Sequence, residues 1–138
     1  MRILVDTNVI IDYVADREPY AACAYKIIEM CITKTVTGCI AAHSVVNLFY
    51  ILRKELSVEE RKVMLMKLCR VFYVVDIDIF KIQTALKNDE FKDLEDCLQY
   101  ECAKDFRADY IVTRNEKDFT SGKIKAIAPR EFLAVFGL

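Results

Sequence analysis

Acidic and amide side chains recur in three short stretches of this 138-residue sequence. Asp6 lies in ILVDTNVIID, Asp93 and Asp96 lie in DLEDCLQYECA, and Asn115 and Asp118 lie in TRNEKDF. Carboxylates that come together repel one another unless a proton or a cation intervenes. Hard oxygen ligands of this kind suit Mg²⁺ or Mn²⁺. If the fold brings these stretches together, the residue types favour a site for a divalent cation.

Each of these residues also has an ordinary structural interpretation. Asp6 suits the N-cap of a helix that follows a strand. Asp93 and Asp96 suit the first turn of a helix, where acids complement the macrodipole. Asn115 and Asp118 are common turn formers. What favours a site is that three separate segments place such side chains at one edge of the same predicted sheet.

Five short apolar runs predict the strands of that sheet. They are residues 2–5, 35–41, 72–77, 109–113 and, more weakly, 125–128. Helical patterns lie between and after them, beginning at Pro19, His43, Ser57, Asp78, Asp93 and Pro129. Ser57 and Glu60 form a capping-box pattern that predicts a new helix there.

The alternation of strands and helices predicts parallel βαβ units with helices on both faces of the sheet. We therefore expect a three-layer α/β/α sandwich with a central, mostly parallel sheet. A chain of 138 residues suits a single domain spanning residues 1–138. In such folds ligands bind outside the carboxyl ends of the strands, where the polar stretches lie.

Composition narrows the partners and the compartment. The net charge of −1 gives no global attraction to nucleic acid, so such a partner needs a local patch. We interpret the basic residues between Arg53 and Arg70 as a solvated helix face. The N-terminus lacks a secretory signal and no apolar run is long enough to cross a bilayer, so we expect a cytosolic protein without a membrane partner. The six cysteines are expected to be reduced core thiols.

Three stretches of the chain occur in a characteristic order and spacing: DTNVIIDY, DLEDCLQYECA and ADYIVTRNEKDF. In these stretches the chain resembles the PIN-domain family, which includes toxin ribonucleases of VapC type. The resemblance covers nearly the whole chain. It implies a three-layer α/β fold with an acidic cleft that binds Mg²⁺ or Mn²⁺ and cleaves RNA. It also implies a small antitoxin protein that blocks the cleft, and a homodimer.

The resemblance carries roles onto particular residues. Asp6 and Asp96 match two of the family's acids and are the expected metal ligands and catalytic residues. Asp93 and Asn115 join them as candidate catalytic residues. The expected supporting residues are Asn8, Asn47, Thr113, Asp118 and Glu95, and the candidate RNA contacts are Arg114 and Lys117.

Two departures from the family pattern leave a second interpretation open. Asn47 stands where the family usually has a Glu, and Asn115 stands where many members have an acid. The sequence therefore predicts either a metal-dependent ribonuclease or a non-catalytic PIN-like module with a degenerate acidic site that binds RNA or protein.

Two other enzyme classes fit less well. A phosphatase of the haloacid-dehalogenase type needs a second Asp two residues after the first, where this chain has Asn8. A metal-free ribonuclease uses histidines as acid and base, and His43 is the only histidine, which we interpret as a structural or helix-start residue.

Overall fold

The five predicted strands form one parallel sheet in the order β3-β2-β1-β4-β5. The computed structural model describes all residues, 1–138. The strands are β1 (Arg2–Val5), β2 (Thr37–Ala41), β3 (Tyr73–Val75), β4 (Tyr110–Val112) and β5 (Lys125–Ile127). Every neighbouring pair is parallel, so the sheet is entirely parallel rather than mostly so. Each observed strand except β1 is shorter than the apolar run that predicted it.

Helices connect and cover the strands. The α-helices are α1 (Thr7–Val14), α2 (Ala21–Ile32), α3 (Ala42–Ile51), α4 (Val58–Val71), α5 (Ile79–Lys87), α6 (Leu94–Phe106) and α7 (Pro129–Val135). Two short 3₁₀ helices, η1 (Leu52–Lys54) and η2 (Glu116–Phe119), complete the chain. The predicted capping box opens α4, because Ser57 and Glu60 exchange hydrogen bonds between their side chains and main-chain N–H groups. None of the helices combines the length and apolar character that a membrane span requires.

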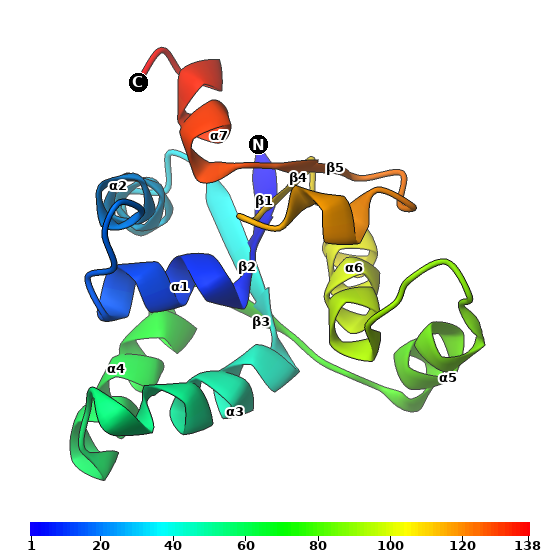
Figure 1. Cartoon of the computed structure of the whole chain (residues 1–138), viewed down its shortest axis with the longest axis horizontal. Coiled ribbons are helices and arrows are strands. Elements are labelled where there is room, and N and C mark those ends of the chain that lie inside the picture. Colours follow the sequence, from blue (N-terminus) through cyan, green and yellow to red (C-terminus); the bar gives the residue numbers. More distant parts are fainter.

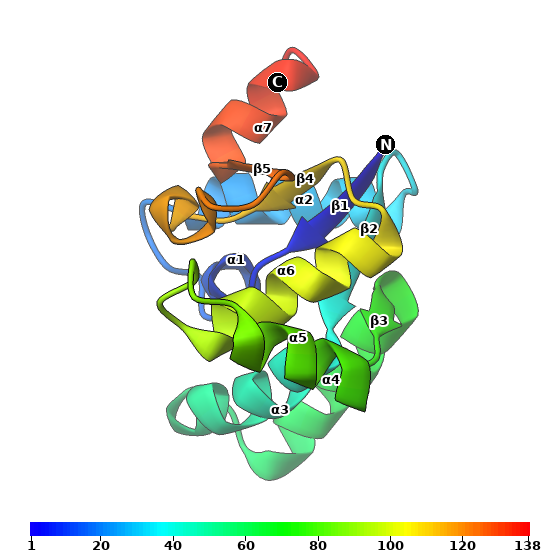
Figure 2. The ribbon, with the colours of Figure 1, turned by 90° about the vertical axis from the view of Figure 1, so that its right-hand side faces the viewer.

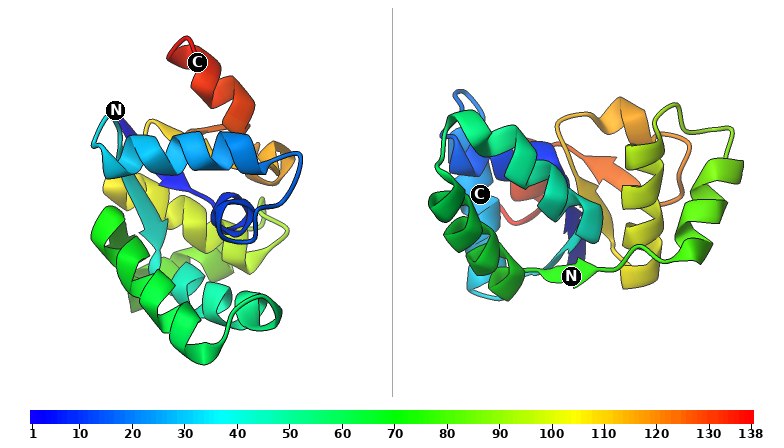
Figure 3. Two further views of the ribbon diagram at one scale, coloured as in Figure 1. Left: turned by 90° about the vertical axis from the view of Figure 1, so that its left-hand side faces the viewer. Right: turned by 90° about the horizontal axis from the view of Figure 1, so that it is seen from below.

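The expected three layers are present (Figure 1). On one face, α6 packs against the strands and α5 lies outside it (Figure 2). On the other face, α1, α2 and α4 cover the sheet (Figure 3). Strand β1 shows why both faces are needed, since Ile3 and Val5 join the core on the α1 side while Leu4 joins the core under α6.

Helix α1 was not among the helical patterns identified in the sequence, although the N-cap interpretation of Asp6 implied a helix there. It begins directly after β1, with only Asp6 between them, and no turn residue separates the two apolar patterns. Its eight residues are also fewer than pattern-based recognition of a helix needs. The junction matters because it fixes Asp6 at the carboxyl end of the central strand.

Two further expectations need correction. Arg61, expected on a solvated face, is buried, and its guanidinium donates to the carbonyl oxygens of Phe49 and Ser57. The six cysteines are free as expected, but Cys69 is exposed rather than part of the core.

Candidate functional site

Asp6 is a buried carboxylate surrounded by hydrogen-bond donors. It directly follows β1, and Thr113 directly follows the neighbouring strand β4, so the pairing of Val5 with Val112 sets the two residues side by side. The Thr113 hydroxyl donates to Asp6 Oδ2 at 2.7 Å, and Asn8 Nδ2 donates to the same oxygen at 3.1 Å. Gln99 Nε2, from α6, donates to Oδ1 at 2.9 Å.

The side chain of Asp6 does not cap α1. Asp6 occupies the N-cap position, but its carboxylate makes no capping hydrogen bond. Both oxygens face donors from other elements instead. The capping interpretation of this residue is therefore wrong for the side chain, and the carboxylate is available as part of a site.

Asp93, in contrast, is a genuine helix cap. It is the N-cap of α6, and its Oδ1 accepts the main-chain N–H of Asp96 at 3.0 Å. The side chain is exposed, and Glu95 lies in the first turn of the same helix. The capping interpretation of Asp93 is confirmed, and the cap also anchors the turn that carries Asp96.

Asp96 lies in a strongly acidic environment. Burial raises the pKa of its carboxyl group, the charges of Asp93, Asp6, Asp118 and Glu95 add to the rise in that order, and together they bring the pKa to about 7. No hydrogen bond offsets this rise. The fold thus gathers carboxylates from three separate segments around one carboxyl group.

A polar cleft of about 400 Å³ opens beside Asp96. It is lined by Glu90, Lys92, Asp93, Asp96, Lys117, Asp118, Thr120 and Ser121. Asp6 does not line it, so Asp96 lies between the buried carboxylate and the open cleft.

The walls of the cleft are tied to α6. The main-chain N–H of Lys123 donates to the Tyr100 hydroxyl at 2.7 Å, and a Cβ at Gly122 would collide with the Tyr100 ring. The Ser121 hydroxyl donates to the carbonyl oxygen of Glu90 at 3.3 Å, which joins the loop before α6 to the loop after η2. These contacts keep Asp118 near the acids of α6.

The donor set fits a hard divalent cation by its chemistry. It consists of carboxylate and amide oxygens, and the raised pKa of Asp96 reflects burial together with a repulsion between carboxylates that a cation would relieve. No three His, Cys, Asp or Glu residues come together as a preformed metal cluster. Mg²⁺ commonly binds through one or two carboxylates and keeps several water ligands, so Asp6 and Asp96 can suffice as protein ligands.

Helix α3 contributes amide and imidazole groups. The Thr7 hydroxyl donates to Ser44 Oγ at 3.0 Å, which ties α1 to α3. Asn47 is half-buried one turn further along the helix. Burial lowers the pKa of His43, while Glu95, Asp6 and Asp93 oppose that shift, so this ring also lies beside the acids. Both ring nitrogens of His43 are buried without a hydrogen-bond partner.

The predicted residues after β4 occupy different environments. The N–H of Asn115 donates to Thr113 Oγ1 at 2.9 Å, and its exposed side chain makes no hydrogen bond. The guanidinium of Arg114 is paired with Asp12. Lys117 is exposed and lines the polar cleft. Lys117 is therefore open to solvent, whereas the charge of Arg114 is already matched.

Two residues of the site were not predicted from the sequence. Gln99 is 1% exposed, and its Oε1 has no hydrogen-bond partner although its Nε2 serves Asp6. The signal for Gln99 was its position three residues after Asp96, on the same side of α6. The signal for Asp12 was a charged residue inside the otherwise apolar stretch VIIDYV.

Comparisons with known proteins agree with this architecture. Residues 2–117 match the family model described as PIN domain. A toxin-antitoxin complex from Klebsiella pneumoniae contains a chain that is 24% identical with a TM-score of 0.68, over 92% of this chain and 97% of that one. VapBC2 from Rickettsia felis, bound to a promoter DNA fragment, gives 19% identity and a TM-score of 0.66, over 93% of this chain and 98% of that one.

FitAcB from Neisseria gonorrhoeae gives 18% identity and a TM-score of 0.66, over 93% of this chain and 98% of that chain. A search of curated protein sequences found no match. At these identities the structural likenesses establish the shared fold.

Proposed function

The chain belongs to the PIN-domain family, and we propose that it is a divalent-metal-dependent endoribonuclease whose active site is the acidic cleft beside Asp6 and Asp96. PIN domains are generally nucleases. The observation that carries the proposal is the gathering of acids from separate segments around Asp96, which adds to the effect of burial in raising the pKa of its carboxyl group. A site that concentrates negative charge in this way suits a cation that also engages a phosphate.

The proposed roles follow from the surroundings of each residue. Asp6 and Asp96 hold the cation, Mg²⁺ or Mn²⁺, and Asp93, Glu95 and Asp118 add negative charge around it. A bound divalent cation supplies charge neutralisation at the scissile phosphate and lowers the pKa of a bound water. Thr113, Asn8 and Gln99 keep the Asp6 carboxylate in one orientation.

The remaining roles concern the substrate. Lys117 and Lys92 line the cleft and neither forms an ion pair, so they are suited to contact the RNA backbone. Arg114, also expected at the RNA, would act there only if it left Asp12. The six free cysteines support a reducing compartment such as the cytosol.

The test is cleavage of single-stranded RNA by the purified chain with Mn²⁺, with Mg²⁺ and with EDTA. Asp6→Asn is nearly isosteric, so it should fold and should abolish metal-dependent cleavage. Asp89→Asn serves as the matched control, because Asp89 is an exposed acid outside the cleft. Cleavage that survives in Asp6→Asn, or that EDTA does not affect, contradicts the proposal.

Asn47 and Asn115 favour a second candidate, a non-catalytic module that binds RNA or a protein through the same fold. The polar cleft then lacks two of the usual charges and holds no catalytic cation. This candidate predicts RNA retention without cleavage by the parent chain, and the same retention by Asp6→Asn in the presence of EDTA.

We also propose a protein partner of antitoxin type, because the structural neighbours include chains of toxin-antitoxin complexes. A second cavity supports a protein partner. It is an apolar groove of about 780 Å³ between α1, α2 and α4, lined mostly by hydrophobic side chains. Exposed apolar surface of this kind marks interaction sites.

A substitution at Val63 tests whether a partner protein binds in the groove. It lines the groove on α4 and is 54% exposed, whereas Met66 is 58% exposed on the same helix and lies outside the groove. Val63→Lys should reduce capture of a candidate antitoxin protein, while Met66→Lys should not. Equal capture by both variants contradicts a partner in the groove.

We also propose a homodimer, supported by exposed apolar side chains outside the groove. Val46 and Tyr50 on α3 are 71% and 63% exposed, and Ile79 and Phe80 on α5 are 67% and 71% exposed. Light scattering of the purified chain and of Phe80→Lys measures the mass. A parent chain that stays monomeric at high concentration contradicts the dimer.

A further inference from the structure

A buried ion pair lies next to the Asp6 site. Asp12, on α1, is 1% exposed. Its carboxylate accepts from Arg114 Nε at 2.6 Å and from Arg114 Nη2 at 3.2 Å. The guanidinium also lies over the Tyr20 ring, 4.2 Å from the ring centroid. Arg114 is therefore held between a carboxylate on α1 and an aromatic ring at the start of α2.

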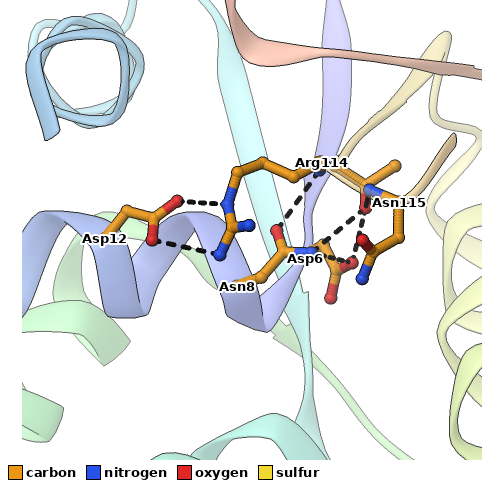
Figure 4. Close-up of polar contacts among 6 residues, drawn as sticks. Asp6, Asn8, Asp12, Arg114 and Asn115 are labelled. Carbon is orange, nitrogen blue, oxygen red and sulfur yellow. Dashed lines mark hydrogen bonds and ion pairs between the residues drawn. The ribbon is translucent and has the colours of Figure 1, made fainter. Parts of the chain in front are cut away.

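The ion pair connects to Asp6 through Asn8. The main-chain N–H of Arg114 lies 3.4 Å from Asn8 Oδ1, to which it donates. The opposite end of the same amide, Nδ2, donates to Asp6 Oδ2. The Asp6 carboxylate and Thr113 Oγ1 accept from the donor end of this amide, and the Arg114 N–H, by donating to the acceptor end, holds the amide in the same orientation. Figure 4 shows this chain of contacts from Asp12 to Asp6.

We propose that Asp12 is a positioning residue for the metal-binding carboxylate. Asp12 holds Arg114, Arg114 orients the Asn8 amide, and Asn8 fixes Asp6 in the orientation needed to hold a cation. The inference rests on the proposed function in its last step, cation binding by Asp6. The earlier steps concern only the orientation of Asn8 and Asp6.

Strand β4 does not by itself hold the Arg114 side chain in place. The main-chain N–H of Thr113 donates to the carbonyl oxygen of Ile127, so β5 fixes the base of the loop. Beyond Thr113, the N–H of Asn115 donates to Thr113 Oγ1, and the contacts to Asp12 and Tyr20 hold the side chain of Arg114. Cutting the ion pair should thus leave the sheet intact and release Arg114 and Asn8.

An ion pair that only stabilises the fold should affect the melting temperature and not the Asp6 site. The chain contains another ion pair that serves as a control. Lys81, with a side chain 9% exposed, pairs with Asp105 at 2.8 Å between α5 and α6. Asp105→Asn removes the shortest of three ion-pair contacts of the buried Lys81, away from the Asp6 site. It should lower the melting temperature without changing the site.

The experiment compares the full-length parent with Asp12→Asn, Arg114→Lys and Asp105→Asn well below their melting temperatures. Mn²⁺ affinity is measured by calorimetry, and the Asn8 side-chain amide and the Asp6 carboxyl carbon are followed by NMR. Removing a residue that orients a metal ligand typically costs 10–100-fold in metal affinity. We expect Asp12→Asn to weaken Mn²⁺ binding by about tenfold or more and to shift both resonances.

Arg114→Lys keeps the charge but loses the two-point contact, so its effect should be smaller in the same direction. It also keeps the test decisive if Asp12→Asn does not fold. Unchanged Mn²⁺ affinity and unchanged Asn8 and Asp6 resonances in a folded variant overturn the proposal. If the parent binds no Mn²⁺, the proposed function fails, and the two resonances still decide whether Asp12 positions Asp6.

Discussion

Asp6 and Asp96 are two carboxyl groups of one site in opposite environments. Asp6 is more deeply buried, yet three side chains donate hydrogen bonds to its oxygens. Asp96 has no such donor, and four neighbouring acids add to the effect of burial and raise its pKa to about 7. Burial acts on Asp96 together with the charges of its neighbours, whereas Asp6 is surrounded by hydrogen-bond donors.

The two carboxyl groups should therefore respond differently to a cation. The Asp6 carboxylate is held by fixed donors whether or not a cation is present. The Asp96 carboxyl group is partly protonated near neutral pH, so a cation there competes with a proton. Mn²⁺ binding should consequently tighten as pH rises through about 7.

Removing a side chain that donates a hydrogen bond to Asp6 should have the largest effect on stability. Thr113→Val keeps the shape of the side chain but leaves buried polar atoms unpaired, so the free energy of unfolding should fall by about 2 kcal/mol. Urea denaturation measures the change. Thr35→Val is the control, since Thr35 is exposed, and it should change stability by less than about 0.5 kcal/mol. Equal losses in the two variants would mean that the donors to Asp6 are unimportant.

Neutralising Asp96 should have the opposite sign. Its pKa is raised in the folded state, so its ionisation destabilises the fold progressively as pH rises from about 4 to about 7. Asp96→Asn should therefore be more stable than the parent at pH 8 and nearly equal to it at pH 4. The full shift corresponds to at most about 4 kcal/mol, and solvent screening reduces the expected gain to about 1–2 kcal/mol.

The same variant should lose the cation response. Millimolar Mn²⁺ should raise the melting temperature of the parent by mass action and leave that of Asp96→Asn almost unchanged. Melting curves at pH 4 and 8, with and without Mn²⁺, provide both readouts. A variant that is less stable than the parent at pH 8 would show that Asp96 is not repelled by its neighbours.

Adding a charge at Asn47 should have the smallest effect on stability. Asn47→Glu supplies the acid that the family usually has and should tighten Mg²⁺ binding, because affinity rises with the number of charged oxygen ligands. Without a cation the added repulsion should lower the melting temperature slightly. Asn47→Gln is the control, with the same length and no charge. A lower melting temperature without tighter Mg²⁺ binding would argue for the non-catalytic candidate.

Local sequence patterns predicted most of the fold. The apolar runs located all five strands, and the capping box placed the start of α4. The missed helix, α1, is short and joins β1 through a single residue, so its pattern merges with that of the strand. Such patterns succeed because strand and helix periodicities arise from neighbours along the chain.

The sequence also identified the acidic residues, because Asp6, Asp93 and Asp96 stand at the ends of predicted elements. It did not show which of these side chains cap a helix and which do not. Asp93 caps a helix and Asp6 does not, although both occupy N-cap positions. Residue type and position are the same in the two cases, so only the surrounding atoms distinguish them.

By itself, the sequence determined the order of elements and the family, because both are written in contiguous residues. Only the tertiary structure decided which groups meet Asp6: Gln99 lies 93 residues away along the chain and Thr113 lies 107 residues away. The pairing of Asp12 with Arg114 and the raised pKa of Asp96 arise in the same way. Hydrogen bonds and charge interactions act over a few ångströms in space, so the register of the sheet and the packing of α6 determine them.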